Sequence, residues 1–278
     1  MQDITRNNAL LLSLIGDYLT FHERDITAEQ IESLTACGIS EERAYRRLLI
    51  SHIGVTDREL LDEYFPSLTK KLDPNEYRAD PYFQNISFAE KSLGGWRIGK
   101  GNYAPYELFV CDDFKLDGEK LVLSLGYFSE PFDYPAVYEN SRLWMSVTPN
   151  EINTMKKPIA AARGKALTFG LGLGYYAYMC SLKPEISSVT VVERDQSIIR
   201  LFKEHILPQF EHAEKIRIVE ADAYDFLASL RDGEYDTAFV DIHHDAGDGR
   251  EVYLRFKERT FTQTRFDFWI EDTIKYYL

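Results

Sequence analysis

The sequence predicts an α/β protein whose C-terminal half is a doubly wound, mainly parallel sheet. Two observations predict this: from residue 148 onward short apolar runs alternate with helical stretches, and the first run ends in a glycine-rich turn. Strands that alternate with helices are typical of βαβ units, which pair in parallel. We expect an N-terminal helical region at 1–74, a small antiparallel β unit at 75–147 and the sheet domain at 148–278.

The N-terminal region carries helix-start signals in front of apolar residues at helical spacing. Thr27 with Gln30 and Thr56 with Glu59 match the capping box, and Ser40 is positioned to cap a third helix. The turn before Ser40 resembles that of a helix-turn-helix. Because two acidic residues follow Ser40, where phosphates would lie, we favour a packed helical hairpin over a DNA-reading motif.

The second range is rich in aromatic residues. Residues 76–144 hold 15 of the 38 aromatic residues of the chain, and apolar and polar positions alternate there with period two. Asp117-Gly118 is a strong hairpin signal. We expect a small antiparallel β unit whose rings are mostly core, with the loop at 127–134 as a candidate pocket wall.

The third range begins with a helix that Thr148, Pro149 and Glu151 open through a capping box. Five strands are then expected at 166–169, 188–193, 216–219, 237–241 and 266–270, separated by helices at 175–181, 196–210, 224–230 and 250–259. No further strand follows the fifth. We expect the N-terminal part, or a second subunit in a homodimer, to cover that sheet edge.

Composition narrows the classes of partner. The 32 Lys and Arg against 45 Asp and Glu give a net charge of −13, which disfavours a nucleic-acid partner. Cys37, Cys111 and Cys180 have neither zinc nor disulfide spacing, which indicates a reducing, cytoplasmic location. The apolar run at 9–15 is too short to span a bilayer, so we expect no membrane partner and a small-molecule or protein substrate instead.

A ligand-binding turn follows the first strand of the sheet domain. Glycines at this point let the backbone turn tightly and approach a ligand as the next helix begins. The second strand ends in an acid about 20 residues later, where a carboxylate can bind ribose hydroxyls, and an acid and a small residue follow the third strand. These residues are Gly170, Gly172, Gly174, Glu193, Asp222 and Ala223.

In this order the elements resemble the class I S-adenosylmethionine-dependent methyltransferase family, from about residue 148 onward. The resemblance implies a Rossmann-like fold, S-adenosylmethionine as cofactor and methyl transfer to a small molecule or a protein side chain. It implies that the glycines lie against the methionine part, that Glu193 binds the ribose, and that Asp222 with the Ala223 amide reads the adenine. A nicotinamide dinucleotide would require glycine where Tyr175 stands. Many members have an acid near the methionyl ammonium, where this chain has Thr168.

The order of the three ranges is similar to that of spermidine synthases, which transfer an aminopropyl group from decarboxylated S-adenosylmethionine. The likeness is carried by residues 189–195, by Leu207-Pro208 and by Asp241. Those enzymes have an acid in the glycine turn, where this chain has Leu173, and a Tyr-His-Glu element that is absent here. We therefore rank methyl transfer above aminopropyl transfer. The alternative from another class is a non-catalytic regulator that binds S-adenosylmethionine.

The segment after the fourth strand is the candidate catalytic segment. It carries Asp241, His243 and His244 on a glycine-rich loop, at the strand end where open parallel sheets bind ligands. Methyl transfer requires the protein to position the acceptor and remove its proton, so these three are candidate bases. Asp241 with Glu271 and Asp272 only loosely matches a divalent cation site, and we expect no metal.

Overall fold

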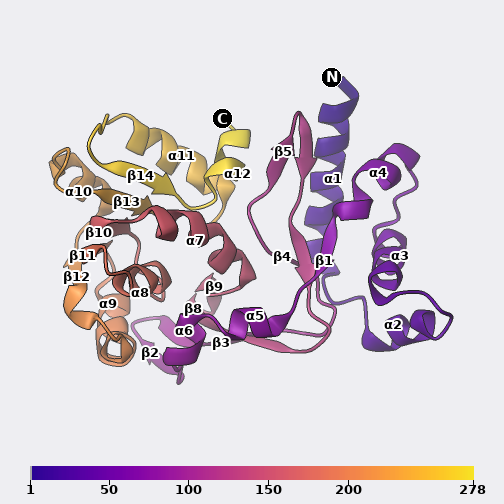
Figure 1. Ribbon diagram of the computed structural model, residues 1–278, viewed down its shortest axis with the longest axis horizontal. Helices are drawn as coiled ribbons and strands as arrows, with labels where there is room; N and C mark the ends of the chain where they lie inside the picture. Colours follow the sequence, from indigo (N-terminus) through magenta and orange to yellow (C-terminus); the bar gives the residue numbers. More distant parts are fainter. Residues whose placement is uncertain (1) are drawn as a thin grey trace. The chain divides into compact units, whose positions relative to one another are not determined.

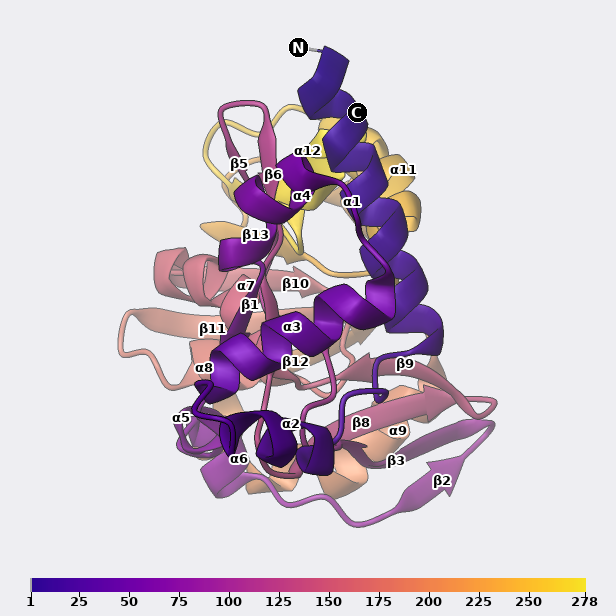
Figure 2. The same cartoon turned by 90° about the vertical axis from the view of Figure 1, so that its right-hand side faces the viewer.

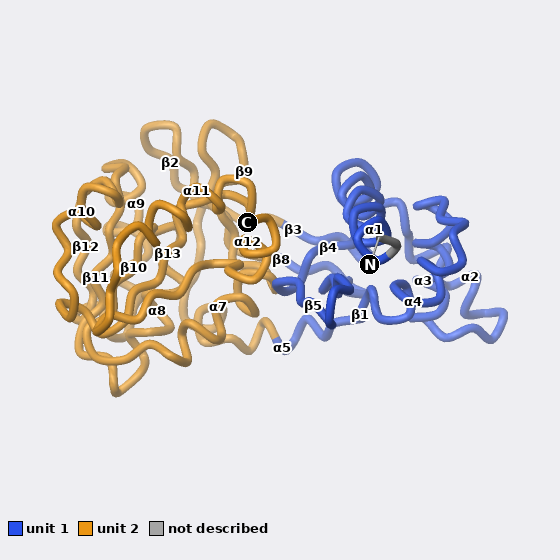
Figure 3. The backbone as a smooth tube through the Cα atoms, turned by 90° about the horizontal axis from the view of Figure 1, so that it is seen from above, with its two compact units in different colours: residues 1–76, 102–133 blue, residues 77–101, 134–278 orange. Residues whose placement is uncertain are grey.

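The computed structural model describes residues 2–278, which form two compact units (Figure 3). Unit 1 comprises residues up to 76 and 102–133, and unit 2 comprises 77–101 and 134–278. The aromatic-rich range 75–147 is divided between both units, and the expected ranges 1–74, 75–147 and 148–278 stay a prediction. The physical reason is strand pairing: β1 (Thr69–Lys71), which follows the N-terminal helices, pairs in parallel with β7 (Leu125–Tyr127).

Unit 1 packs its helices around one apolar core (Figure 2). The helices are α1 (Gln2–Phe21), α2 (Ala28–Thr35), α3 (Glu41–Ile53), α4 (Arg58–Glu63) and the 3₁₀ turn η1 (Phe65–Ser67). The capping box of Thr27 and Gln30 is confirmed. The second box is wrong by one position, because Asp57 caps α4 by accepting a hydrogen bond from the Leu60 amide. Ser40 precedes α3 without a side-chain capping bond.

The strands of unit 1 form one small sheet and one hairpin. The sheet order is β1-β7-β4, with β4 at Phe109–Val110. The hairpin joins β5 (Lys115–Asp117) to β6 (Lys120–Val122), and Gly118 has φ +62° in its turn, as the sequence predicted. Tyr127, Phe128 and Phe132 are fully buried, so these rings are core.

Two short helices lie at the start of the range where the sequence predicted a β unit. Pro74 begins α5 (Pro74–Arg78), within which the chain passes from unit 1 to unit 2, and Pro81 begins α6 (Pro81–Asn85), which Asp80 caps. A four-stranded sheet follows in the order β2-β3-β8-β9. Its strands are β2 (Lys91–Leu93), β3 (Trp96–Tyr103), β8 (Phe132–Glu139) and β9 (Arg142–Ser146).

The predicted parallel sheet is confirmed and dominates unit 2 (Figure 1). Its order is β12-β11-β10-β13-β14, and all four pairings are parallel. The strands are β10 (Gly164–Phe169), β11 (Ile186–Glu193), β12 (Ile216–Glu220), β13 (Thr237–Val240) and β14 (Arg265–Phe268). The helices are α7 (Pro149–Ala161), α8 (Tyr175–Ser181), α9 (Gln196–His205), α10 (Ala223–Ser229), α11 (Ala246–Lys257) and α12 (Glu271–Tyr276), with 3₁₀ turns η2 (Leu207–Gln209) and η3 (Ala213–Lys215).

Three boundaries differ from the prediction for local reasons. Helix α9 ends at His205 and a separate turn follows, because Pro208 has no amide to continue the helix. Strand β14 ends two residues early, and the backbone at Ile270 has φ +45°. Helix α11 begins at Ala246 instead of residue 250. There the side chain of Asp245 accepts hydrogen bonds from two amides at the helix start, which outweighs the low helix propensity of the glycines.

The sheet leaves one edge of β14 without a strand partner among residues 2–278. Arg265 and Asp267 on this strand bond each other at 2.7 and 2.8 Å, and charges of this kind discourage pairing with a foreign strand. The expected cover by the N-terminal part or by a second subunit stays a prediction. None of the helices in the described residues has the length and apolarity that a membrane crossing requires.

Helix α7 is held at its C-terminus and near its middle. Lys183 Nζ donates to the carbonyls of Ile159, Ala160 and Ala162 at 2.6 to 3.0 Å, and so satisfies the C-terminus of the helix. Near the middle of the helix, Trp269 Nε1 donates to Thr154 Oγ1 at 3.1 Å. These bonds attach α7 to the segment after α8 and to the segment after β14.

We expect Lys183→Met to destabilise the protein by about 2 kcal/mol, because three carbonyls lose a charged donor. Urea denaturation measures the change. Lys165→Met is the matched control, since Lys165 is exposed, and it should change stability by less than about 0.5 kcal/mol. Equal effects of the two substitutions would contradict the anchoring role.

Candidate functional site

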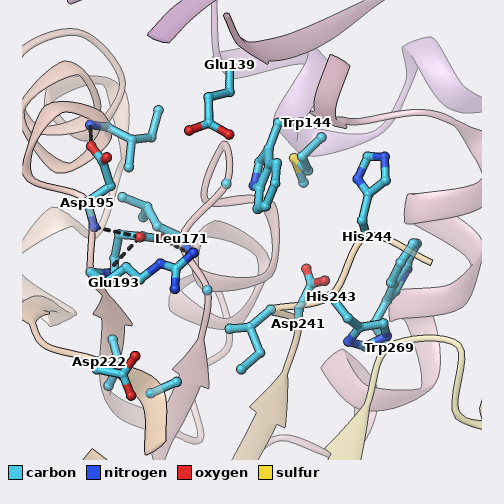
Figure 4. Close-up of a pocket in the computed structure, with 18 of the residues that line it drawn as sticks. Glu139, Trp144, Leu171, Glu193, Asp195, Asp222, Asp241, His243, His244 and Trp269 are labelled. Atoms are coloured by element: carbon cyan, nitrogen blue, oxygen red, sulfur yellow. Dashed lines mark hydrogen bonds between the residues drawn. The ribbon is translucent and has the colours of Figure 1, made fainter. Parts of the chain in front are cut away.

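A pocket of about 260 Å³ lies within unit 2 at the carboxyl ends of the parallel strands (Figure 4). It is lined from the segments that follow β10, β11, β12, β13 and β14, and by Trp96, Glu139 and Trp144 from the antiparallel sheet. The strand ends meet here because the register pairs Phe169 with Val192 and with Val240. The candidate residues after different strands are thus brought to one place.

The glycine turn has the close approach that the sequence predicted. Gly170 has φ +97°, and a Cβ there would overlap the carbonyl oxygen of Asp241. Gly174 has φ +75° and begins α8. The Tyr82 hydroxyl donates to the carbonyl of Leu173 and holds the turn from the side opposite the next strand. Gly170 and Gly172 line the pocket, whereas Gly174 does not.

Glu193 lies in the pocket wall with its carboxylate fixed by backbone amides (Figure 4). One oxygen accepts from the amides of Arg194 at 2.7 Å and Asp195 at 2.9 Å, and the other accepts from Leu171 at 3.2 Å. An ionised carboxylate has about four acceptor positions, so about one is left for a ligand hydroxyl. The carboxylate therefore joins the glycine turn to β11 and still faces the pocket.

Asp222 caps a helix and also lines the pocket. Its Oδ1 caps α10 by accepting from Tyr224 at 2.8 Å and from Asp225 at 3.3 Å. Both bonds use the same oxygen, so the second oxygen is available to the pocket that Asp222 and Ala223 line. Helix capping and ligand binding are thus compatible at this position.

The two positions that depart from the family pattern are both buried. Thr168 lies inside β10 and Leu173 is fully buried; neither lines the pocket. The side chain of Leu173 is therefore not placed to accept or reject the tail of a cofactor. Any acid that contacts such a tail must come from another element.

Glu151, in the first turn of α7, is an acid that lines the pocket from another element, and the sequence indicated it only as a capping residue. Thr148 makes no side-chain capping bond, so the predicted capping box is wrong. Glu151 is 9% exposed, lines the pocket, and its Oε2 is buried without a hydrogen-bond partner among the described residues. The only sequence signal was an acid three residues after a Thr, a spacing that the capping box explains equally well.

Glu151 and Asp241 line the same pocket, and the charge of Asp241 acts on Glu151; the two are called the carboxyl pair below. Burial, and secondarily the charge of Asp241, raises the pKa of Glu151 well above its ordinary value. Burial raises the pKa of Asp241 to about 7. Two neighbouring carboxyls in a low-dielectric site cannot easily ionise together, so in the empty site the pair retains a proton near neutral pH.

The two histidines differ in environment. His243 is 7% exposed and its ring lies 5.3 Å from that of Trp269, and burial lowers its pKa to about 4. It is therefore neutral at pH 7. His244 lines the pocket and stacks on Trp144 at 5.8 Å between ring centres (Figure 4).

Among the described residues, we find no group of three or more His, Cys, Asp or Glu side chains that could hold a metal ion. Glu271 pairs with Lys275 at 2.8 Å and accepts from the Tyr253 hydroxyl, so its carboxylate is already engaged. The expectation that no metal binds at Asp241, Glu271 and Asp272 stays a prediction.

Comparisons with known proteins found structural likeness only. No family model and no curated protein matches the chain. Among solved structures it resembles a spermidine synthase in complex with the transition-state analogue AdoDATO (13% identity, 52% of this chain, TM-score 0.38), the Thermotoga maritima spermidine synthase (13%, 46%, 0.35) and the Geobacter metallireducens precorrin-6y C5,15-methyltransferase (18%, 44%, 0.33). The chain covers 61%, 59% and 63% of those chains. Likeness this distant identifies neither an activity nor a substrate.

We expect the carboxyl pair to make stability fall as pH rises. An unfolded carboxyl titrates at about 4, whereas the folded pair retains protons to about 7 or higher. The folded state therefore binds more protons in this window, and its stability decreases with pH across it. The free energy of unfolding of Glu151→Gln, relative to that of the parent protein, should therefore increase by about 2 kcal/mol when the pH is raised from about 5 to about 8.

Urea denaturation at the two pH values measures this difference. Glu220→Gln is the control, because Glu220 is exposed and lies outside the pocket. If the stability of Glu151→Gln and that of the parent protein changed with pH in parallel, the proposed effect of the carboxyl pair on stability would be disproved.

Proposed function

We propose that this protein is an S-adenosylmethionine-dependent methyltransferase that acts on a small molecule or a protein side chain. The observation that carries the proposal is the order of groups along one pocket: Asp222 after β12, Glu193 at the end of β11 and the glycine turn after β10. Neighbouring strands are about 4.8 Å apart, so an extended nucleoside derivative would cross these positions in sequence.

In this arrangement each group has a distinct part. The free oxygen of Asp222 and the Ala223 amide would bind the adenine, and Glu193 would accept a ribose hydroxyl. The backbone at Gly170 and Gly172 would lie against the sulfonium side of the cofactor, with the Met145 side chain beside Gly172. The amides that fix Glu193 pre-organise its carboxylate, which reduces the entropy lost when the ligand binds.

The acceptor would enter between the turn and the wall formed by Trp144 and His244. Transfer is an in-line displacement at the sulfonium methyl group, so the protein has to align the acceptor and take its proton. Asp241 is suited to take the proton, because its raised pKa lies near the working pH. His244, stacked on Trp144, would orient the acceptor.

We expect Glu193→Gln to weaken the binding of S-adenosylhomocysteine by about 10-fold or more, because a hydrogen bond to a charged group contributes about 1.5 to 3 kcal/mol. Isothermal calorimetry measures the affinity. Glu220→Gln is the matched control, since Glu220 pairs in register with Glu193 on the next strand but does not line the pocket. Unchanged affinity in Glu193→Gln would remove the ribose assignment.

We expect the transfer rate to rise with pH through about 7, because Asp241 must be ionised to accept a proton. His243 cannot produce this rise, since its pKa is about 4. Asp241→Asn should lower kcat/KM by about 10²-fold. Incubation of the protein and labelled cofactor with cell extract provides the assay, and a flat pH profile would exclude Asp241 as the base.

A second candidate, aminopropyl transfer, is favoured by one observation: the acidic pair of Glu151 and Asp241 would repel the carboxylate of the intact cofactor. Competition between S-adenosylmethionine and its decarboxylated form for the protein separates the two reactions. We expect the intact form to bind at least as tightly. A preference of about 10-fold or more for the decarboxylated form would favour aminopropyl transfer. Tight binding without any transfer would indicate the non-catalytic regulator.

A further inference from the structure

A groove of about 470 Å³ lies in unit 2 at the amino ends of the parallel strands. Its walls are the end of α11, the loop 259–264 and strand β14, together with Arg163 in front of β10. The pocket of the proposed function lies at the carboxyl ends of the same strands and shares no lining residue with the groove. The groove is therefore a separate feature, and the proposed function does not use it.

The groove is positively charged, although the protein has a net charge of −13. None of the described residues that line it is Asp or Glu, and four are cations: Arg163, Lys257, Arg259 and Arg265. A surface whose sign is opposite to that of the whole protein attracts anionic partners locally. Which of the four cations are available to such a partner depends on their present contacts.

Two of the cations are engaged within the chain. The guanidinium of Arg259 donates to the carbonyls of Leu227 and Leu230 at the end of α10. The guanidinium of Arg265 donates to both carboxylate oxygens of Asp267 at 2.7 and 2.8 Å. These two arginines therefore shape the groove and contribute little free charge.

The other two cations have no counter-ion. The described residues offer no carboxylate to Arg163 or to Lys257, and both side chains are exposed. The Lys257 ammonium lies 5.1 Å from the centre of the Phe268 ring, which places it beside β14. The backbone of Arg163 is fixed, because its carbonyl accepts from the Thr237 hydroxyl at 3.4 Å. Two positive charges thus face the groove without a partner.

The loop wall of the groove is held by Asp232. Its carboxylate accepts from the Thr262 hydroxyl and from the amides of residues 262–264, at 2.7 to 3.1 Å. These bonds hold the pKa of Asp232 well below its ordinary value, so the group is ionised and fully engaged. A wall fixed in this way loses little conformational freedom when a ligand binds.

Strand β14 forms another wall, and it is an edge strand of the sheet. Among residues 2–278 it pairs only with β13, to which the amides of Arg265 and Trp269 donate. Backbone groups alternate in direction along a strand, so the amides and carbonyls of Phe266 and Phe268 point to the open edge. The cationic groove therefore adjoins unpaired backbone donors and acceptors.

We propose that the groove and the open edge of β14 bind an extended, acidic segment of a partner protein. The segment would add to β14 as a further strand, and its carboxylates would pair with Arg163 and Lys257. The pair of Arg265 and Asp267 has no net charge, so it disfavours an apolar strand without repelling an acidic one. A second copy joined edge to edge is disfavoured, because it would bring the same unpaired cations to the same edge.

The probe is a fluorescent peptide of about eight residues with alternating glutamate and valine, and the control peptide has lysine in place of glutamate. Fluorescence anisotropy measures the binding of each peptide to the full chain. We expect the acidic peptide to bind and the basic peptide to fail. Added salt should weaken the binding, because the charges that attract the peptide are exposed.

The variants Arg163→Gln and Lys257→Gln test the two free cations. Each should weaken the binding of the acidic peptide by about 3- to 5-fold, and the double variant by about 10-fold or more. Arg217→Gln is the matched control, since Arg217 is exposed on β12, the strand at the other edge of the same sheet. This control removes one positive charge and should leave the affinity unchanged.

Amide hydrogen exchange, measured by NMR, tests the strand addition separately from the charge. A saturating amount of the acidic peptide should slow the exchange of the Phe266 and Phe268 amides by about 10-fold or more, because a paired strand protects them. The basic peptide should leave their exchange unchanged.

Three results would overturn the proposal. The first is equal affinity of the acidic peptide for the parent protein and the double variant, or no binding at all. The second is unchanged exchange of the Phe266 and Phe268 amides in the complex, since it would exclude a paired strand. The third is a dimer of the parent protein in sedimentation that the double variant dissociates, because a second copy would then occupy the edge. Tighter competition by single-stranded RNA than by the acidic peptide would likewise assign the groove to another class of partner.

Discussion

The architecture of the site depends on one constraint: parallel strands end at the same edge, and at that edge the backbones of β10 and β13 come into direct contact. Gly170 makes the contact possible, because any side chain there would overlap the carbonyl of Asp241. The Asp241 amide in turn donates to the Phe169 carbonyl at 2.9 Å. With the strand ends joined in this way, the glycine turn, Glu193 and Asp241 face one pocket without any of them having to move.

The same edge of the sheet also contains a feature that lowers the stability of the folded state. Two carboxyl groups with raised pKa values lie together, and the structure holds them there through α7, whose C-terminus is satisfied by Lys183 and whose side chain at Thr154 is bonded by Trp269. These two carboxyl groups lower the stability of the folded state near neutral pH, and they give the pocket a place that can accept a positive group. Strain of this kind is typical of functional sites, where surrounding packing determines the conformation.

The sequence predicted the alternation of strands and helices in the C-terminal half because those signals are local: an apolar run, a glycine turn and an acid each occur within a few residues. It did not predict Glu151, since its spacing from Thr148 fits a capping box and its electrostatic coupling to Asp241 joins residues 90 positions apart. The division of the aromatic-rich range between the two units was not predicted either, because the parallel pairing of β1 with β7 is not visible in either strand alone. The early start of α11 was missed because glycines after Asp245 indicated a loop, while the capping bonds of Asp245 favour a helix.

Charge connects the two candidate reactions to the same few side chains. Under the proposed function the cofactor is positive at its sulfonium centre, so an acidic pocket with a single guanidinium would attract it whichever group is transferred. The difference between the reactions lies at the tail, where the intact cofactor brings an ammonium and a carboxylate and the decarboxylated form brings the ammonium alone. The side chain of Leu173 is buried and does not line the pocket, so the discrimination between the two forms would fall to the acids that do, Glu151 and Asp241.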